Sequence, residues 1–272
     1  MEVDLPAVSV IIPTKDSAEH LPALLRSLER QTCSNFEVIL VDNNSRDETV
    51  PIARRWGCTI EKSGPERSAQ RNRGAELANA DRLLFVDSDM ELDSHIVSST
   101  IGTIPEADAV CYLEIPLPAP TYLSQARALE RRCYFQSIIF EASRGFSRRA
   151  FVDLGGYNVH LTGLEDMDIQ ARAIARGLRI GWISCPLYHH EENLTTMNYL
   201  RKRWGYSSSS DALFRQLHPD FWAELKSPLR RGKRVLQKLR QSESWSEVTL
   251  IPGLILVRGI EMAIRYSGSK RR

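Results

Sequence analysis

Two carboxylates, Asp87 and Asp89, stand one residue apart directly after the apolar run 83–86. Alternate residues of an extended chain face the same way, so both side chains can point to one side. Neighbouring carboxylates repel one another unless a cation lies between them, and Mg²⁺ or Mn²⁺ with substrate phosphates is the usual resolution. The motif indicates a divalent-cation site, although a solvated acidic turn has the same pattern.

The same Asp-x-Asp pattern occurs after an apolar strand in phosphatases of the haloacid dehalogenase type, where the first Asp is a nucleophile. Those motifs normally end in Thr or Val, whereas position 91 here is Glu. The motif also follows a fourth predicted strand. Both features weaken the phosphatase interpretation.

Arg67 and Arg71 lie four residues apart in segment 64–74 and share one face of a predicted helix, near its N-terminus. The helix dipole disfavours cations at that end. An anion between the two side chains would reverse the penalty, and a diphosphate fits. A solvated basic helix is the simpler alternative, but it does not explain cations in the first turn.

Further candidates lie in the second half of the chain. Asp166 and Asp168 open an amphipathic helix, where acids often act only as caps and dipole partners; the functional alternative is a general base that deprotonates a hydroxyl. His189 and His190 follow a predicted strand and should point apart, so at most one faces a metal.

The elements that position these residues alternate in type. Apolar runs at 8–12, 36–41, 58–60 and 82–86 are separated by helical patterns at 17–31, 49–56 and 67–79, which predicts a parallel sheet with helices on both faces. Ligands gather beyond the carboxyl ends of such strands. Three strands end in clusters that contain a carboxylate, namely Lys15-Asp16, Asp42-Asn43 and Asp87-Ser88-Asp89. A dinucleotide-binding domain is disfavoured because no G-x-G-x-x-G follows the first strand.

From residue 111 the pattern is mixed, with helices predicted at 124–140 and 166–176 and a strand at 180–183.

The chain has 272 residues and a net charge of +2, so a basic field for nucleic acid is absent. Five scattered cysteines without a C-x-x-C pair fit a reducing cytosol. The N-terminus lacks signal-peptide features, and the apolar segment 248–264 contains Arg258 and Glu261, so we expect a cytoplasmic protein that does not span a membrane.

Together these features resemble the family 2 glycosyltransferases with the GT-A fold. Each motif is weak alone, but their order and spacing over roughly residues 8–205 are highly specific. The matching segments are Val8-Ser-Val-Ile-Ile-Pro-Thr-Lys-Asp16, Val41-Asp-Asn-Asn-Ser-Arg-Asp-Glu-Thr49, 67–74, Phe85-Val-Asp-Ser-Asp89, Gly155-Gly-Tyr157 and Glu165-Asp166.

The resemblance implies a fold and an activity. The fold is a Rossmann-like, mostly parallel α/β sheet with a donor-binding half (1–110), an acceptor and catalytic half (111–205) and a helical C-terminal region (206–272). The activity is transfer of a sugar, with inversion, from a nucleotide-diphosphate sugar to a glycan or lipid-linked acceptor, with Mn²⁺ or Mg²⁺ as cofactor. An inactive sugar-nucleotide-binding or scaffold protein is the rival in another class; Asp89 and Asp166 together speak against it. A nucleotidyltransferase would need a glycine-rich N-terminal loop that is missing.

The resemblance also assigns roles to single residues. Asp166, second in the Glu165-Asp166 pair, matches the catalytic base, and Asp89 the metal ligand. The remaining implied substrate contacts are Thr14 and Asp16 at the nucleoside, Asp42 at the base, Arg71 near the base or diphosphate, Asp87 at the ribose or sugar, and His189 at the metal or diphosphate. Arg67, Ser88 and Glu165 are expected to contact the substrate as well.

Two segments depart from the family pattern, and a third suggests a location. Asp42-Asn-Asn44 lacks the usual glycine at its third position, which questions the local turn geometry. The segment Ser143-Arg-Gly-Phe146 stands where smaller residues are frequent, which suggests an unusual acceptor pocket.

Residues 225–240 combine seven cations with several leucines. They are either a solvated helix packed on the core or a helix on an anionic membrane surface, followed by segment 248–264 and the tail 270–272.

Overall fold

The computed structural model of this chain describes residues 5–117, 121–190, 209–239 and 249–255. Within these residues the first half contains β1 (Val8–Thr14), α1 (Leu21–Glu29), β2 (Phe36–Asp42), α2 (Thr49–Arg55), β3 (Thr59–Lys62), α3 (Arg67–Leu77), β4 (Arg82–Phe85), β5 (Met90–Leu92) and α4 (Ile96–Thr103). The second half contains β6 (Ala109–Pro116), α5 (Tyr122–Tyr134), β7 (Ser143–Ser147), α6 (Arg148–Leu154), α7 (Glu165–Ala175), β8 (Ile180–His189), α9 (Ser209–Leu217), α10 (Pro219–Lys226) and α11 (Pro228–Leu239).

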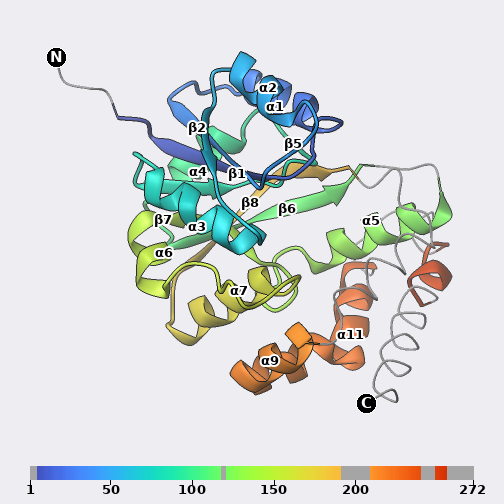
Figure 1. Cartoon of the computed structure of the whole chain (residues 1–272). Helices are drawn as coiled ribbons and strands as arrows, with labels where there is room; N and C mark the ends of the chain where they lie inside the picture. Colours follow the sequence, from blue (N-terminus) through green and yellow to red (C-terminus); the bar gives the residue numbers. More distant parts are fainter. Residues whose placement is uncertain (1–4, 118–120, 191–208, 240–248, 256–272) are drawn as a thin grey trace.

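The strands form one sheet with the order β3-β2-β1-β4-β7-β6-β8-β5. The four strands predicted from the first ninety residues are parallel, as expected, and Thr14 pairs with Asp42 at the carboxyl ends of β1 and β2. Their apolar, β-branched runs suit strands that are covered on both faces. The predicted α/β fold with helices on both sides is confirmed (Figure 1).

The second half of the chain extends the same sheet. β7 is antiparallel to both β4 and β6, and β6 is parallel to β8. The strand predicted at 180–183 is longer than expected, because β8 runs on through Pro186 to His189. The register between β6 and β8 shifts at this point, and a proline is tolerated at such an irregularity because it has no N–H to donate.

Two hydrophobic cores lie on the two faces of the sheet. One contains Val8, Val10 and Ile12 of β1 with residues of α1, α2 and α4. The other contains Ile11 of β1 with residues of α3, α6 and α7. Alternating side chains of one strand therefore serve both faces, as the strand period requires.

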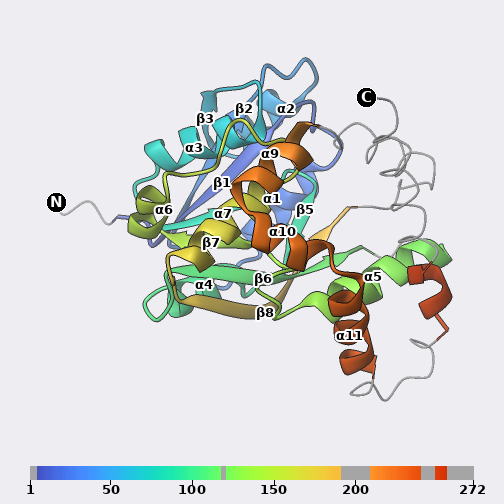
Figure 2. The same cartoon turned by 90° about the horizontal axis from the view of Figure 1, so that it is seen from below.

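A third core joins α5 to the C-terminal helices through Leu129, Phe214 and Leu225. α5 and α11 pack together, and both views place them side by side at one end of the sheet (Figures 1 and 2). The predicted helix at 124–140 is too long: α5 ends at Tyr134, and Gln136 has a φ of +65°, which a helix cannot contain.

The basic segment predicted at 225–240 is helical but is divided between α10 and α11, because Pro228 opens the second helix. In the part of the chain that the structure describes, no helix is both long enough and apolar enough to cross a membrane. Most of segment 248–264 and the tail 270–272 lie outside the described residues.

Candidate active site

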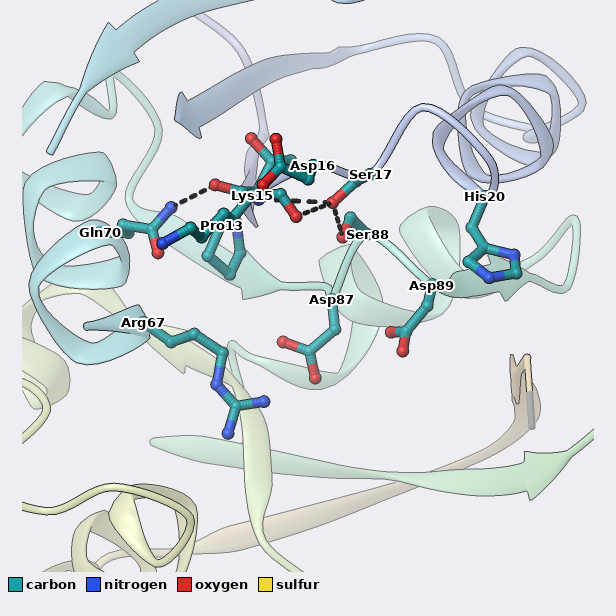
Figure 3. A pocket seen from close by; sticks show the side chains of 11 residues that line it. Pro13, Lys15, Asp16, Ser17, His20, Arg67, Gln70, Asp87, Ser88 and Asp89 are labelled. Atoms are coloured by element: carbon teal, nitrogen blue, oxygen red, sulfur yellow. Dashed lines mark hydrogen bonds between the residues drawn. The ribbon is translucent and has the colours of Figure 1, made fainter. Parts of the chain in front are cut away.

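A cavity of about 300 Å³ opens where β1 and β4 end, and we call it the strand-end cavity. Figure 3 shows Asp87 and Asp89 pointing to the same side of it, with Arg67 facing them from α3. The lining residues are Pro13, Thr14, Lys15, Asp16, Ser17, His20, Arg67, Gln70, Asp87, Ser88 and Asp89. Six of these were predicted from the sequence as substrate or metal contacts; the other five, Pro13, Lys15, Ser17, His20 and Gln70, were not.

Hydrogen bonds fix the ends of β1 and β2 behind this cavity. Gln70 Nε2 donates to the carbonyl oxygens of Thr14 and Val41 at 2.8 and 2.6 Å, so one buried side chain of α3 joins both strands. Asp42 is buried at the end of β2 and accepts hydrogen bonds from the backbone N–H and hydroxyl of Ser45 at 3.0 and 2.5 Å. Its carboxylate is thereby preorganised, although it does not itself line the cavity.

The turn after Asp42 lacks the family's glycine but keeps the conformation that glycine would supply. Asn44 has a φ of +53°, in the left-handed region that asparagine tolerates better than most residues. Asp16 also has a positive φ, of +46°, and accepts a hydrogen bond from the backbone N–H of Arg46 at 2.7 Å. The two loops are therefore joined, and the departure at Asn44 leaves the position of Asp42 intact.

A buried arginine, Arg71, forms the centre of the site. Its guanidinium contacts Asp87 Oδ1 at 2.6 Å and Asp166 Oδ1 at 3.0 Å, and its side chain is fully buried. Burial alone would raise the pKa of Asp87, but the charges of Arg71, Arg144 and Arg67 hold it well below its usual range. Asp87 is thus a permanent anion whose position is set from two sides.

The anion that lies between Arg67 and Arg71 is Glu165. Its Oε1 is 3.0 Å from Arg67 Nη2 and 3.5 Å from Arg71 Nη1. Burial, together with the nearby charge of Asp166, raises the pKa of Glu165 despite these arginines. The carboxylate explains how two cations can occupy the first turns of α3; a contact of either with a diphosphate stays a prediction.

Asp89 and His189 meet at the edge of the strand-end cavity, with Asp89 Oδ1 3.1 Å from His189 Nε2. Burial would lower the pKa of His189, but the hydrogen bond to Asp89 and the charges of Asp89, Glu114 and Asp87 outweigh it, and the pKa is raised. His190 Nε2 lies 2.8 Å from Glu91 Oε1, and the His190 ring stacks on that of His20 with ring centroids 5.0 Å apart.

The carboxylate and the imidazole suit Mn²⁺ or Mg²⁺ as a pair of ligands. Among the described residues no group of three or more His, Cys, Asp or Glu side chains could hold a metal ion. Magnesium-type sites commonly use one or two protein ligands and take the rest from substrate phosphates and water. Asp89 and His189 fit that arrangement.

The two acids at the start of α7 have different surroundings. Asp168 is buried and pairs with Arg172 Nε at 2.9 Å and His218 Nε2 at 2.8 Å, so it anchors α9 and α10 to α7. The Asp166 side chain is 30% exposed and lines a second cavity of about 250 Å³, which we call the lateral cavity. Only Asp166 is therefore placed to meet a substrate.

The lateral cavity is enclosed by α5, the segment 140–144, the start of α7 and the helices α10 and α11. Its lining residues are Glu114, Arg127, Glu130, Arg131, Tyr134, Phe140, Glu141, Ala142, Arg144, Gly163, Leu164, Asp166, Met167, Leu225, Lys226 and Arg231. Arg144 belongs to its wall and also reaches Asp87 Oδ2 at 3.1 Å, so the Asp87–Arg144 pair lies between the two cavities. An arginine of the segment that departs from the family pattern thus lines this cavity.

Several site residues were missed from the sequence. Arg144 and Glu114 form a buried ion pair, and opposing its burial, Arg144 and Arg131 lower the pKa of Glu114 to about 2. For Glu114 the available signal was a charged residue within the apolar strand β6; β7, with the sequence Ser-Arg-Gly-Phe-Ser, gave no such signal for Arg144. Tyr157 was named only as part of a motif; its ring lies 5.0 Å from the Arg71 guanidinium, and its backbone pairs with the side chain of Asn72.

Comparison with known proteins agrees with this geometry. The model of the family described as glycosyl transferase family 2 matches residues 9–147, so the chain belongs to that family. A relative named PGL/p-HBAD biosynthesis glycosyltransferase, from Mycobacterium bovis, is 34% identical over 183 residues, which cover 62% of this chain and 70% of the relative. The O-antigen chain rhamnosyltransferase RfbN of Salmonella typhimurium is 25% identical over 214 residues, covering 69% and 67% of the two chains.

Solved structures share the fold at low sequence identity. The mannosyltransferase PcManGT from Pyrobaculum calidifontis, in complex with GDP-Man and Mn²⁺, has a TM-score of 0.64 and 16% identity, covering 98% of this chain and 87% of that one. TarS of S. aureus in complex with UDP-GlcNAc has a TM-score of 0.57 and 18% identity, covering 94% and 81%. The chain is therefore a family 2 glycosyltransferase with the GT-A fold.

Proposed function

We propose that this chain is a metal-dependent, inverting glycosyltransferase that uses a nucleotide-diphosphate sugar in the strand-end cavity and an acceptor hydroxyl in the lateral cavity. One observation carries the proposal. Arg71 bridges Asp87, which lines the first cavity, and Asp166, which lines the second. A general base and a donor-binding carboxylate are thus held in fixed relation on either side of one buried guanidinium.

In the proposed reaction Asp166 accepts the proton of the acceptor hydroxyl, and the oxygen attacks the anomeric carbon of the donor from the lateral side. The bond from that carbon to the diphosphate oxygen breaks, and a single displacement of this kind inverts the configuration. Asp89 and His189 would hold a divalent cation, which supplies the positive charge that stabilises the departing diphosphate. Arg67 lines the same cavity and adds positive charge on the opposite side.

The nucleotide sugars bound by the structural neighbours support this choice of donor class. One neighbour binds GDP-Man with Mn²⁺ and another binds UDP-GlcNAc. The names of two relatives, one for PGL/p-HBAD biosynthesis and one an O-antigen chain rhamnosyltransferase, support a glycan or lipid-linked acceptor. The donor base and sugar are left open by this reasoning.

The test is the variant Asp166→Asn, with the exposed Asp153→Asn as its control. Losing the base should lower kcat by roughly 10²–10⁴-fold. Binding of UDP or GDP with Mn²⁺, measured by thermal shift, should be retained because Asp166 does not line the strand-end cavity. Equal turnover by Asp166→Asn and the wild type would refute the assignment of Asp166 as the general base. Nucleotide binding without turnover by the wild type would favour the inactive alternative.

We also propose that α11 attaches the protein peripherally to an anionic membrane. Leu229 and Leu236 are seven residues apart on one face and are 85% and 58% exposed, with Arg230 and Lys233 beside them. Flotation with phosphatidylserine vesicles should recover the protein at low salt, and Leu229→Asp should weaken recovery. Failure of the wild type to float at any salt concentration would remove this proposal.

A further inference from the structure

Glu141 lines the lateral cavity and is almost fully buried, and one of its two carboxyl oxygens has no hydrogen-bond partner in the part of the chain that the structure describes. Its side chain belongs to a residue that is 3% exposed, and Oε1 has no partner among the described residues. The neighbouring arginines serve other groups: Arg144 pairs with Glu114 and Asp87. A buried polar atom left without a partner costs about 1–3 kcal/mol, so it calls for an explanation.

The surroundings of Glu141 indicate what kind of ligand would complete it. Burial raises its pKa to about 8, with the charge of Glu114 adding to the effect and those of Arg131 and Arg144 opposing it. At neutral pH the group is then mainly a neutral carboxyl, which can both donate and accept a hydrogen bond. A hydroxyl group matches both capacities.

Aromatic rings line the same cavity. Tyr134 and Phe140 lie with their ring centroids 4.7 Å apart, and both belong to the cavity wall. A sugar ring has an apolar face for such rings and hydroxyl groups at its edge for carboxyl groups. An aliphatic alcohol would use the apolar wall but would leave Glu141 unpaired.

We infer that Glu141 recognises a second hydroxyl group of the acceptor, and that the acceptor presents a sugar ring to the lateral cavity. One hydroxyl lies at Asp166 and reacts; another pairs with Glu141 and selects the acceptor. This inference rests on the proposed function, since it takes the lateral cavity to be the acceptor side. Glu141 is then a specificity-determining residue, distinct from the base.

The experiment uses the full chain, a set of p-nitrophenyl glycosides as acceptors, and a set of nucleotide sugars as donors. For the best pair, kinetics are measured with the wild type, Glu141→Leu, Glu141→Gln and the exposed control Glu29→Leu, each with every monodeoxy analogue of the acceptor. Glu141→Leu should raise the acceptor KM about tenfold or more, and Glu141→Gln should restore most of the loss because its amide also donates and accepts.

The deoxy analogues decide between recognition and a packing effect. With the wild type, one analogue should have a kcat/KM about tenfold or more below that of the complete acceptor. With Glu141→Leu the same comparison should give a difference of less than about twofold, because the partner of that hydroxyl is already gone. An unchanged KM in Glu141→Leu, or equal losses for every analogue in both proteins, would overturn the inference. Retained UDP or GDP binding by thermal shift shows that the donor side is intact. A wild type that neither binds nucleotide nor transfers sugar would refute the proposed function itself, and this assignment with it.

Discussion

Replacing Glu141 by glutamine should change how the stability of the protein depends on pH. The pKa of Glu141 is about 8 in the folded chain and has an ordinary value of 4.5. When folding raises the pKa of a carboxyl group, the group's contribution to the free energy of unfolding is fully present below the pKa that it has in the unfolded chain. The group loses that contribution as the pH rises through the folded pKa, because the charged form is disfavoured in the buried site.

The size of the effect follows from the two pKa values. With about 8 in the folded chain and about 4.5 in the unfolded chain, Glu141 loses roughly 3–4 kcal/mol of stabilising free energy between pH 5 and pH 8. Glutamine has a similar shape and no proton to lose. The difference in unfolding free energy between Glu141→Gln and the wild type should therefore grow in favour of the variant by that amount over this range.

Guanidinium denaturation at several pH values between these limits, followed by tryptophan fluorescence, measures the difference directly. Comparing variant and wild type at each pH cancels the titration of all other groups that the substitution does not touch. Glu29→Gln is the control, because Glu29 is exposed on α1 and its curve should run parallel to that of the wild type. Parallel curves for Glu141→Gln as well would refute the view that Glu141 is buried as a neutral acid.

Two further predictions concern the cation and the packing beneath the site. Asp89→Ala should abolish the extra thermal stabilisation that Mn²⁺ adds to UDP or GDP; an unchanged metal effect would contradict the ligand assignment. Gly74→Ala should lower the free energy of unfolding by about 1–3 kcal/mol, because the new Cβ would lie 2.4 Å from Ile11 Cγ2, where α3 packs on β1. Gly102→Ala, in a helix with open space around the new methyl group, should be neutral or slightly stabilising, and equal losses in both variants would contradict the packing argument.

Much of the first ninety residues could be predicted from the sequence because their signals are local. The apolar runs predict buried parallel strands, and they end in Lys15-Asp16, Asp42-Asn43 and Asp87-Ser88-Asp89. Ligands bind at the carboxyl ends of such strands, and the strand-end cavity lies there. These inferences need only neighbours along the chain.

The lateral cavity could not be predicted in this way, because its contacts join residues far apart in the chain. β7 lies beside β4 in the sheet although β5 and β6 come between them in the chain, and this pairing brings Arg144 to Asp87. The periodicity of hydrophobic residues along the sequence does not predict such a pairing. The sequence also gives no sign that Glu141 is buried, because an isolated glutamate normally lies on the surface. Only the folded structure shows its burial.

The burial of Arg71 changes how its role is to be understood. The sequence resemblance suggests contact with the base or diphosphate, but the guanidinium is fully buried and shared among Asp87, Glu165 and Asp166. A buried ion network of this kind contributes little net stability, because desolvation offsets the attraction between the charges. What it does supply is fixed geometry: it ties the first turns of α3 to the end of β4 and to the start of α7. Preorganised charges of this sort stabilise a transition state without having to rearrange during the reaction. In this conformation Arg71 acts through the carboxylates that it positions, so its planar fork matters more than its charge alone.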